Sequence, residues 1–130
     1  MIHSNKYKQT SIQTASPAQL LIMLYDGAIR FCRQAIHAIE QNQIEEANMN
    51  IQKVQNIIHE FSSTLDKNAP IAEQLLPLYE YFQSKLVEAN MHKKTEPLEE
   101  ILEYLKQLKE TWMQAAIEAK KQPQTAGTGS

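Results

Sequence analysis

Four histidines and 15 acidic residues are the side chains of this sequence that could hold a metal ion. A di-iron or di-manganese site in a helical bundle requires Glu-x-x-His motifs on two helices and further glutamates that point inward. The sequence contains no such motif, because His37 and Glu40 stand in the reverse order and Glu88 and His92 are four residues apart. Both pairs fall mainly on polar helix faces and are interpreted as solvated ion pairs. We therefore predict neither a metal site nor a cofactor.

Cys32 could act as a nucleophile only with a base and a charge-stabilising group beside it. It stands in the middle of a predicted helix between Ile29 and Ile36, a position typical of a small buried apolar residue. The sequence also lacks a glycine-rich phosphate loop, a serine nucleophile elbow and a CxxC pair. The carboxylate pairs at residues 45–46 and 99–100 belong to solvated helix faces. We therefore predict that the protein is not an enzyme.

The charges of the chain nearly cancel, with 13 lysines and arginines against 15 aspartates and glutamates. Nucleic-acid binding needs a clustered basic surface, which this balance does not provide. No stretch approaches the ~20 apolar residues that span a membrane, and the polar residues 1–10 do not resemble a signal peptide. A single cysteine excludes an internal disulfide and suits a reducing compartment. We expect a cytoplasmic protein that neither binds nucleic acid nor inserts into a membrane.

The elements that position these side chains are predicted to be helices. Only one of the three glycines, Gly27, lies outside the C-terminal tail, whereas sheets and phosphate loops need glycine at their turns. Apolar residues recur at helical spacing in four segments. The first segment runs from the N-cap Ser16, with Gln19 completing a capping box, to about residue 41. The second begins after Asn42 as its N-cap, with Glu45 at the box position, and runs through 66. The third and fourth run from 70 to about 92 and from 95 to about 120. The short connections predict an all-α, antiparallel four-helix bundle (residues 16–120) with an extended N-terminal arm (1–15) and a disordered tail (121–130).

Two helix interiors contain residues that helices usually avoid. Pro77 removes a backbone hydrogen bond and clashes with the preceding turn, so we expect either a kink or a new helix that begins there. Gly27 costs roughly 1 kcal/mol relative to alanine in the middle of a helix. Close approach of another backbone or of a bulky side chain would compensate for this cost. A tolerated local weakness is the alternative.

The first predicted helix has a wide apolar face, which covers roughly two-thirds of its circumference. One side carries Leu20, Leu24, Gly27, Phe31 and Ala35, and the adjacent side carries Leu21, Tyr25, Ala28, Ile29, Cys32 and Ile36. The helix could lie centrally and touch several neighbours, or part of the face could form a groove for a partner helix or an extended peptide. Both interpretations can hold together, with Tyr7 and Ile12 of the arm covering the groove when no partner is bound.

Two blocks of sequence carry a family resemblance. The first is TASPAQLLIMLYDGAI at residues 14–29, and the second comprises Ile71-Ala72, Leu75, residues 78–81, Leu86 and Ala89-Asn90. In this order, and with the spacing from there to Trp112, they resemble the flagellin export chaperones of the FliS type over about residues 7–118. The chain departs from that pattern at residues 68–70, which replace a frequent Gly-Gly pair, and at Pro77, where the helix is usually uninterrupted.

The resemblance implies a chaperone that binds the C-terminal segment of flagellin, prevents premature polymerisation and delivers the subunit to the flagellar export gate without using ATP. From periodicity we predict that the residues contacting this segment are Leu21, Tyr25, Ile29, Ile36, Leu76, Tyr81, Val87 and Tyr104. A core position with a bonded hydroxyl is an equally good interpretation of Tyr25, and Leu105 and Trp112 are assigned to the core. The alternative function is a plain four-helix adaptor or a dimerising regulator.

Overall fold

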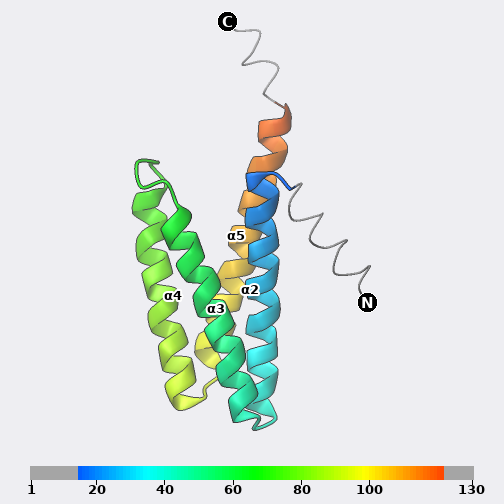
Figure 1. Cartoon of the computed structure of the whole chain (residues 1–130), viewed down its shortest axis with the longest axis vertical. Helices are drawn as coiled ribbons and strands as arrows, with labels where there is room; N and C mark the ends of the chain where they lie inside the picture. Colours follow the sequence, from blue (N-terminus) through cyan, green and yellow to red (C-terminus); the bar gives the residue numbers. More distant parts are fainter. Residues whose placement is uncertain (1–14, 122–130) are drawn as a thin grey trace, which may run out of the picture.

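Four antiparallel helices make up the part of the chain that the computed structural model describes, residues 15–121. They are α2 (Pro17–Glu40), α3 (Ile44–Thr64), α4 (Ala72–His92) and α5 (Glu96–Lys121). Each helix packs against the next along the chain, and α5 closes the bundle against α2 (Figure 1). The predicted four-helix bundle is therefore confirmed, with helix ends within a turn of those predicted. The predicted arm residues Tyr7 and Ile12, and residues 122–130 of the predicted tail, lie outside the described residues.

Hydrogen bonds define both ends of α2. At its start, the Gln19 N–H donates to Ser16 Oγ at 3.2 Å and the Ser16 N–H donates to Gln19 Oε1 at 2.8 Å, which confirms the predicted capping box. At its end, Asn42 adopts the left-handed conformation (φ 56°), and the Gln43 N–H donates to the Ala38 carbonyl at 2.8 Å. This Schellman-type ending makes Asn42 the terminator of α2. The prediction that Asn42 caps the next helix is wrong, because Gln43 holds that position and makes no side-chain cap bond.

Pro77 lies inside α4, which runs without interruption from Ala72 to His92. The alternative in which a new helix begins at Pro77 is therefore wrong. Pro77 cannot donate to the carbonyl of Glu73, one turn earlier. Both residues are exposed, so water can donate to that carbonyl instead. Leu75 and Tyr79 on either side of Pro77 are buried, and their packing holds the segment in the helix.

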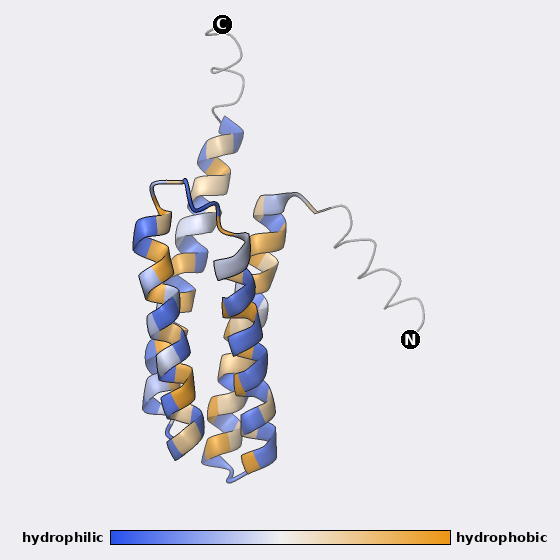
Figure 2. Ribbon diagram, turned by 60° about the vertical axis from the view of Figure 1, so that its left-hand side comes forward, coloured by the Kyte–Doolittle hydropathy of each residue, from blue (hydrophilic) through white to orange (hydrophobic). Residues whose placement is uncertain are grey.

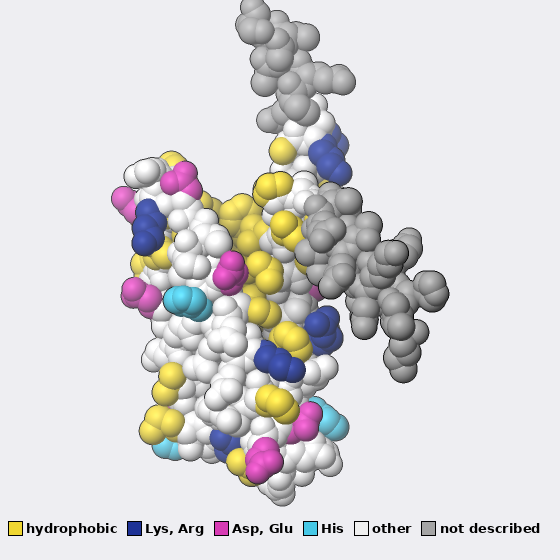
Figure 3. All heavy atoms as spheres, in the orientation of Figure 1, with side chains coloured by type: hydrophobic (Ala, Val, Ile, Leu, Met, Phe, Trp, Pro, Cys, Tyr) yellow, Lys and Arg dark blue, Asp and Glu magenta, His cyan; other side chains and the backbone are white. Residues whose placement is uncertain are grey.

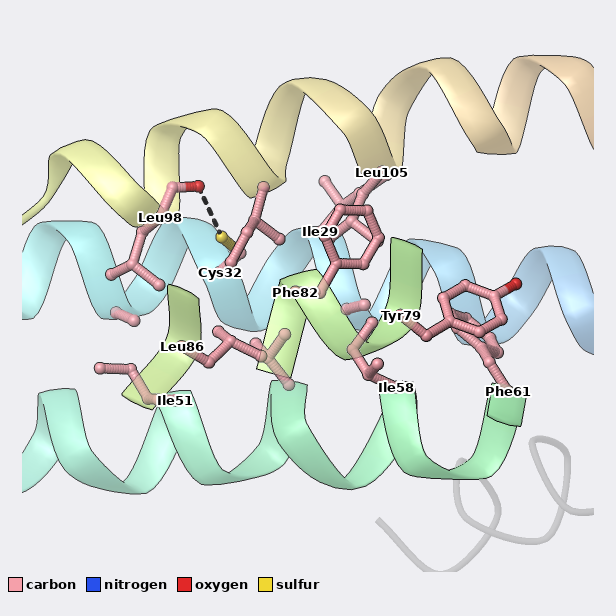
Figure 4. Close-up of a cluster of buried hydrophobic side chains, with 14 of the residues drawn as sticks. Ile29, Cys32, Ile51, Ile58, Phe61, Tyr79, Phe82, Leu86, Leu98 and Leu105 are labelled. Atoms are coloured by element: carbon pink, nitrogen blue, oxygen red, sulfur yellow. Dashed lines mark hydrogen bonds between the residues drawn. The ribbon is translucent and has the colours of Figure 1, made fainter. Parts of the chain in front are cut away.

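All four helices contribute side chains to one hydrophobic core, and hydrophobic and hydrophilic segments alternate along the helices (Figure 2). The residues labelled in Figure 4 show this convergence: Ile29 and Cys32 from α2; Ile51, Ile58 and Phe61 from α3; Tyr79, Phe82 and Leu86 from α4; Leu98 and Leu105 from α5. Full burial of each large apolar side chain stabilises the fold by about 1.5–3 kcal/mol. The core position of Leu105 is confirmed, and Trp112 is half-buried against the same core.

Gly27 lies on the buried side of α2 that faces α3. A Cβ atom at this position would lie 3.5 Å from Ile57 Cδ1, which is an ordinary van der Waals distance. The close approach that was expected to require a glycine is therefore not found. The structure instead fits the alternative, in which Gly27 is a tolerated weakness of the helix.

Candidate partner-binding surface

α2 has a neighbouring helix on each side of its wide apolar face. On one side Gly27 faces Ile57 of α3. On the other side the Lys109 ammonium of α5 donates to Asp26 Oδ1 at 2.6 Å. Like the other three helices, α2 therefore packs against two neighbours, and part of its wide apolar face is buried while the rest stays half-buried.

Tyr25 is the centre of a network that joins all four helices. Its ring stacks on Phe61 of α3 with the ring centroids 4.4 Å apart. Its hydroxyl lies 3.1 Å from the Tyr79 hydroxyl of α4, and the Trp112 indole N–H of α5 donates to it at 3.2 Å. Burial raises the pKa of both tyrosines, so both hydroxyls stay protonated near neutral pH.

The structure corrects the expectation that Tyr25 and Ile29 line a surface groove, because their exposed fractions are 0 % and 7 %. Both side chains lie on the side of α2 against which α5 packs. For Tyr25 the alternative interpretation, a core residue with a bonded hydroxyl, is the one that the structure shows. A buried face and a groove have the same periodicity, and only the packing of the neighbouring helices distinguishes them.

Cys32 is a core residue, as the sequence indicated. Its thiol is fully buried and donates to the Leu98 carbonyl at 3.2 Å. Burial raises the pKa of the thiol to about 12, against a small opposing effect of Arg33. The thiol is therefore protonated near neutral pH, and a protonated thiol is a poor nucleophile.

The acidic and histidine side chains do not converge on a site. Glu88 pairs with Lys85 at 3.5 Å, not with His92. Within residues 15–121, no group of three or more His, Cys, Asp or Glu side chains could hold a metal ion. A shallow cleft of about 720 Å³ between α2 and α5 is lined by charges of both signs, including Arg33 and Glu103. This cleft offers no set of groups aimed at one ligand atom.

Six of the predicted contact residues are at least partly exposed, and they lie on several sides of the bundle. Leu21 and Ile36 of α2 are half-buried against the core. Tyr81 and Tyr104 lie between α4 and α5, where the Tyr81 hydroxyl donates to Glu100 Oε2 at 2.6 Å. The Tyr104 ring packs on Phe82, with 5.5 Å between the ring centroids. Contact of these residues with a partner stays a prediction.

Leu76 and Val87 share the side of α4 that faces α3. Gln83 and Asn90 mark this side, because Gln83 Nε2 donates to the Gln55 carbonyl and Asn90 Nδ2 donates to Asn48 Oδ1. Leu76 is half-buried, whereas 47 % of Val87 is exposed. The six residues therefore do not form a single pocket. They fit a long segment that lies over several helices better than a compact ligand.

Apolar side chains are exposed at the end of the bundle where α2 and α4 begin and where α3 and α5 end. We call this group the apolar end; its members are Leu21, Leu65, Ile71, Trp112, Met113 and Ile117. Figure 3 shows hydrophobic side chains that gather at this upper end and continue downward as a band. A second group, the α2–α3 seam, consists of Leu20, Leu24, Gly27, Phe31 and Ile57.

Most members of these two surfaces were not predicted as partner contacts. Met113 and Ile117 lie near the C-terminal end of α5, off the stripe that fills the core. Phe31 was placed on the wide apolar face of α2, whereas Ile57 was assigned to no stripe, and both are half-buried where α2 and α3 meet. The sequence signal that could have indicated these surfaces is the presence of apolar residues next to a core stripe.

Within residues 15–121, no helix combines the length and hydrophobicity that a membrane crossing requires. A helical bundle with exposed apolar side chains at one end, and with no convergent polar site among the described residues, has the features of a polypeptide-binding protein. The family model described as "Flagellar protein FliS" matches residues 1–120. The chain therefore belongs to the FliS family.

Three proteins named flagellar secretion chaperone FliS illustrate the similarity. The protein of Bacillus subtilis is 36% identical over 121 residues, which cover 93% of this chain and 91% of that protein. The protein of Campylobacter jejuni is 33% identical, with 83% of this chain and 86% of that protein covered. The protein of Salmonella typhimurium is 32% identical, with 85% of this chain and 84% of that protein covered.

Proposed function

We propose that this chain is a cytoplasmic secretion chaperone that binds the C-terminal segment of flagellin before export. The names of the FliS relatives support the chaperone function. The structural observation that carries the proposal is the apolar end, where Leu21 and Trp112 are half-buried and continuous with the core. A segment that is disordered when free can fold onto such a surface and bury its own apolar side chains there.

Reversible binding is what this function requires, because the cargo must be released at the flagellar export gate. Ordering a disordered segment commonly costs about 2–5 kcal/mol or more of the gross interaction energy. That cost keeps the complex from becoming irreversible even when a large apolar area is buried. While the segment is bound, it is unavailable for the contacts that flagellin subunits make in the filament.

The proposed contact set combines the apolar end with Ile36, Leu76, Tyr81, Val87 and Tyr104. These residues lie on more than one side of the bundle, so the bound segment would follow the surface past several helices. A 20-residue helix is about 30 Å long, which is comparable to the length of the helices in this bundle. Tyr25 and Ile29 are left out of the set because they are buried in the core.

Isothermal titration with a peptide from the C-terminal end of flagellin tests the proposal. We expect binding with a negative heat-capacity change, because apolar surface is buried. The emission of Trp112, the only tryptophan in the chain, should shift as its half-exposed ring is covered. A full titration without heat and without an emission change would instead favour the adaptor or the dimerising regulator.

Two similarly exposed apolar residues provide a matched pair of variants. Val87 is exposed to 47 % on the proposed surface, and Ile44 is exposed to 50 % on α3 outside the proposed set. Covering the exposed half of a valine gains about 1 kcal/mol, so Val87→Asp should weaken peptide binding about fivefold. Ile44→Asp should bind like the wild-type chain. Equal affinities of the two variants would remove Val87 from the contact set.

A further inference from the structure

Two cations of neighbouring helices converge on one aromatic ring of the α2–α3 seam. The Arg30 guanidinium lies 4.9 Å from the centroid of the Phe31 ring, and the Lys53 ammonium of α3 lies 5.0 Å from the same centroid. Phe31 is half-buried, while Arg30 and Lys53 are exposed. The seam therefore presents two positive charges at the edge of an apolar strip.

Among residues 15–121, neither cation forms an ion pair with a carboxylate, and Arg30 also borders the mixed-charge cleft between α2 and α5. The ion pairs of the described residues involve Lys85, Lys106 and Lys109, but not Arg30 or Lys53. All 15 acidic residues of the sequence lie within residues 15–121, so residues 1–14 and 122–130 bring no acidic side chain. Residues 1–14 instead carry two lysines. The charge of the seam is thus suited to an acidic group from another molecule and not to a side chain of the arm.

The apolar part of the seam lies next to this cation pair. Leu24 and Ile57 are half-buried, and Gly27 between them adds no side chain to the strip. On the face drawn in Figure 3, basic side chains flank the band of hydrophobic side chains partway along its length. A segment that fits this surface carries apolar side chains and, next to them, a carboxylate.

We infer that the α2–α3 seam holds a stretch of the flagellin C-terminal segment in which a carboxylate stands beside apolar residues, and that Arg30 and Lys53 bind this carboxylate. This assignment rests on the proposed function and adds the chemistry of the bound stretch. Apolar contacts alone allow a helix to slide along a strip, whereas a charged contact at one point fixes its register. Charge-assisted hydrogen bonds to a carboxylate are also stronger than bonds between neutral groups.

Charge reversal of the pair is the test, with the full chain and a synthetic peptide of the flagellin C-terminal segment as the probe. Arg30→Glu with Lys53→Glu should weaken binding about tenfold or more, because two partly exposed ion pairs are lost and repulsion is introduced. It should also reduce the salt dependence of the affinity. The matched control, Lys93→Glu with Lys94→Glu, makes the same change of net charge at the connection between α4 and α5, away from the seam. Thermal unfolding of both variants checks that the fold is kept.

The outcomes separate the two proposals. If the wild-type chain does not bind the peptide, the proposed function fails and the assignment of the seam fails with it. If the wild-type chain binds and the two double variants are weakened equally, only the assignment of the seam is overturned. A peptide in which the bound acidic residue is replaced by lysine should bind the wild-type chain weakly. The same peptide should bind the variant Arg30→Glu with Lys53→Glu more tightly, because the charges are then exchanged between peptide and chain. If no acidic residue of the peptide shows this exchange, the cations do not bind a carboxylate of the segment.

Discussion

Replacing Tyr25 by phenylalanine tests the network that connects α2, α4 and α5. The change removes one oxygen atom and keeps the ring that stacks on Phe61. That oxygen lies 3.1 Å from the Tyr79 hydroxyl and accepts from the Trp112 indole N–H at 3.2 Å. Tyr25→Phe therefore breaks two hydrogen bonds, whereas Tyr79→Phe breaks one of them and leaves the bond to Trp112 in place.

The structure predicts different costs for the two variants. The Tyr79 hydroxyl belongs to a residue that is only 2 % exposed, so in Tyr25→Phe it is left buried without its partner. A buried polar group without a partner costs about 1–3 kcal/mol. The Trp112 N–H is half-exposed and can be satisfied by water, so its loss adds little. We expect Tyr25→Phe to lower the free energy of unfolding by about 2 kcal/mol and Tyr79→Phe by about 1 kcal/mol.

Urea unfolding followed by the emission of Trp112 measures both effects in one experiment. The emission maximum of folded Tyr25→Phe should move to longer wavelength, because water replaces the hydroxyl beside the indole. Folded Tyr79→Phe should keep the wild-type maximum. The double variant should lose less stability than the two single changes together, since it leaves no hydroxyl of the pair buried without a partner. Equal losses for the two single variants, with no change in emission, would refute the network as described.

Three further predictions concern the helices and the buried thiol. Gly27→Ala should raise the free energy of unfolding by about 0.5–1 kcal/mol in urea titrations, because the added methyl group meets only Ile57 at 3.5 Å; a loss of stability would reveal a clash. Pro77→Ala should stabilise the chain by about 1–3 kcal/mol, because α4 regains the bond to the Glu73 carbonyl; no gain would mean that this carbonyl is already well satisfied. For Cys32, the folded thiol has a pKa of about 12 and the ordinary value is 9.0, so between these values the unfolded chain binds fewer protons than the folded chain. The free energy of unfolding should therefore fall as pH rises above 9 and should fall less steeply in Cys32→Ala, and an unchanged slope would contradict the burial of the thiol.

Local signals in the sequence predicted the helices and most of their ends. Ser16, Pro17 and Gln19 form a capping box that has few other interpretations, and the structure has it. Asn42 was misplaced because asparagine favours both the N-cap and the left-handed position after a helix. The choice between these positions depends on the path of the chain into α3, which local propensity does not contain. At Pro77, packing likewise outweighs local propensity. The burial of Leu75 and Tyr79 keeps this proline inside a helix.

The partner-binding surface was harder to predict than the fold. Periodicity identified Tyr25 and Ile29 as part of an apolar face, but it could not show that neighbouring helices cover them. Phe31 was placed on the same wide face, and it remains half-buried between two cations. Whether a residue at the edge of an apolar face is buried or half-buried depends on how closely the neighbouring helix packs there. The crossing geometry of two helices is a property of the packed bundle and cannot be predicted from the sequence of one helix.

Co-elution of this chain with two forms of flagellin tests the central claim most directly. Full-length monomeric flagellin and flagellin lacking its C-terminal segment are each mixed with the chain and separated by size-exclusion chromatography. The account predicts a complex with full-length flagellin and none with the shortened form. Equal co-elution with both forms, or with neither, would contradict the claim that this bundle binds the C-terminal segment of flagellin.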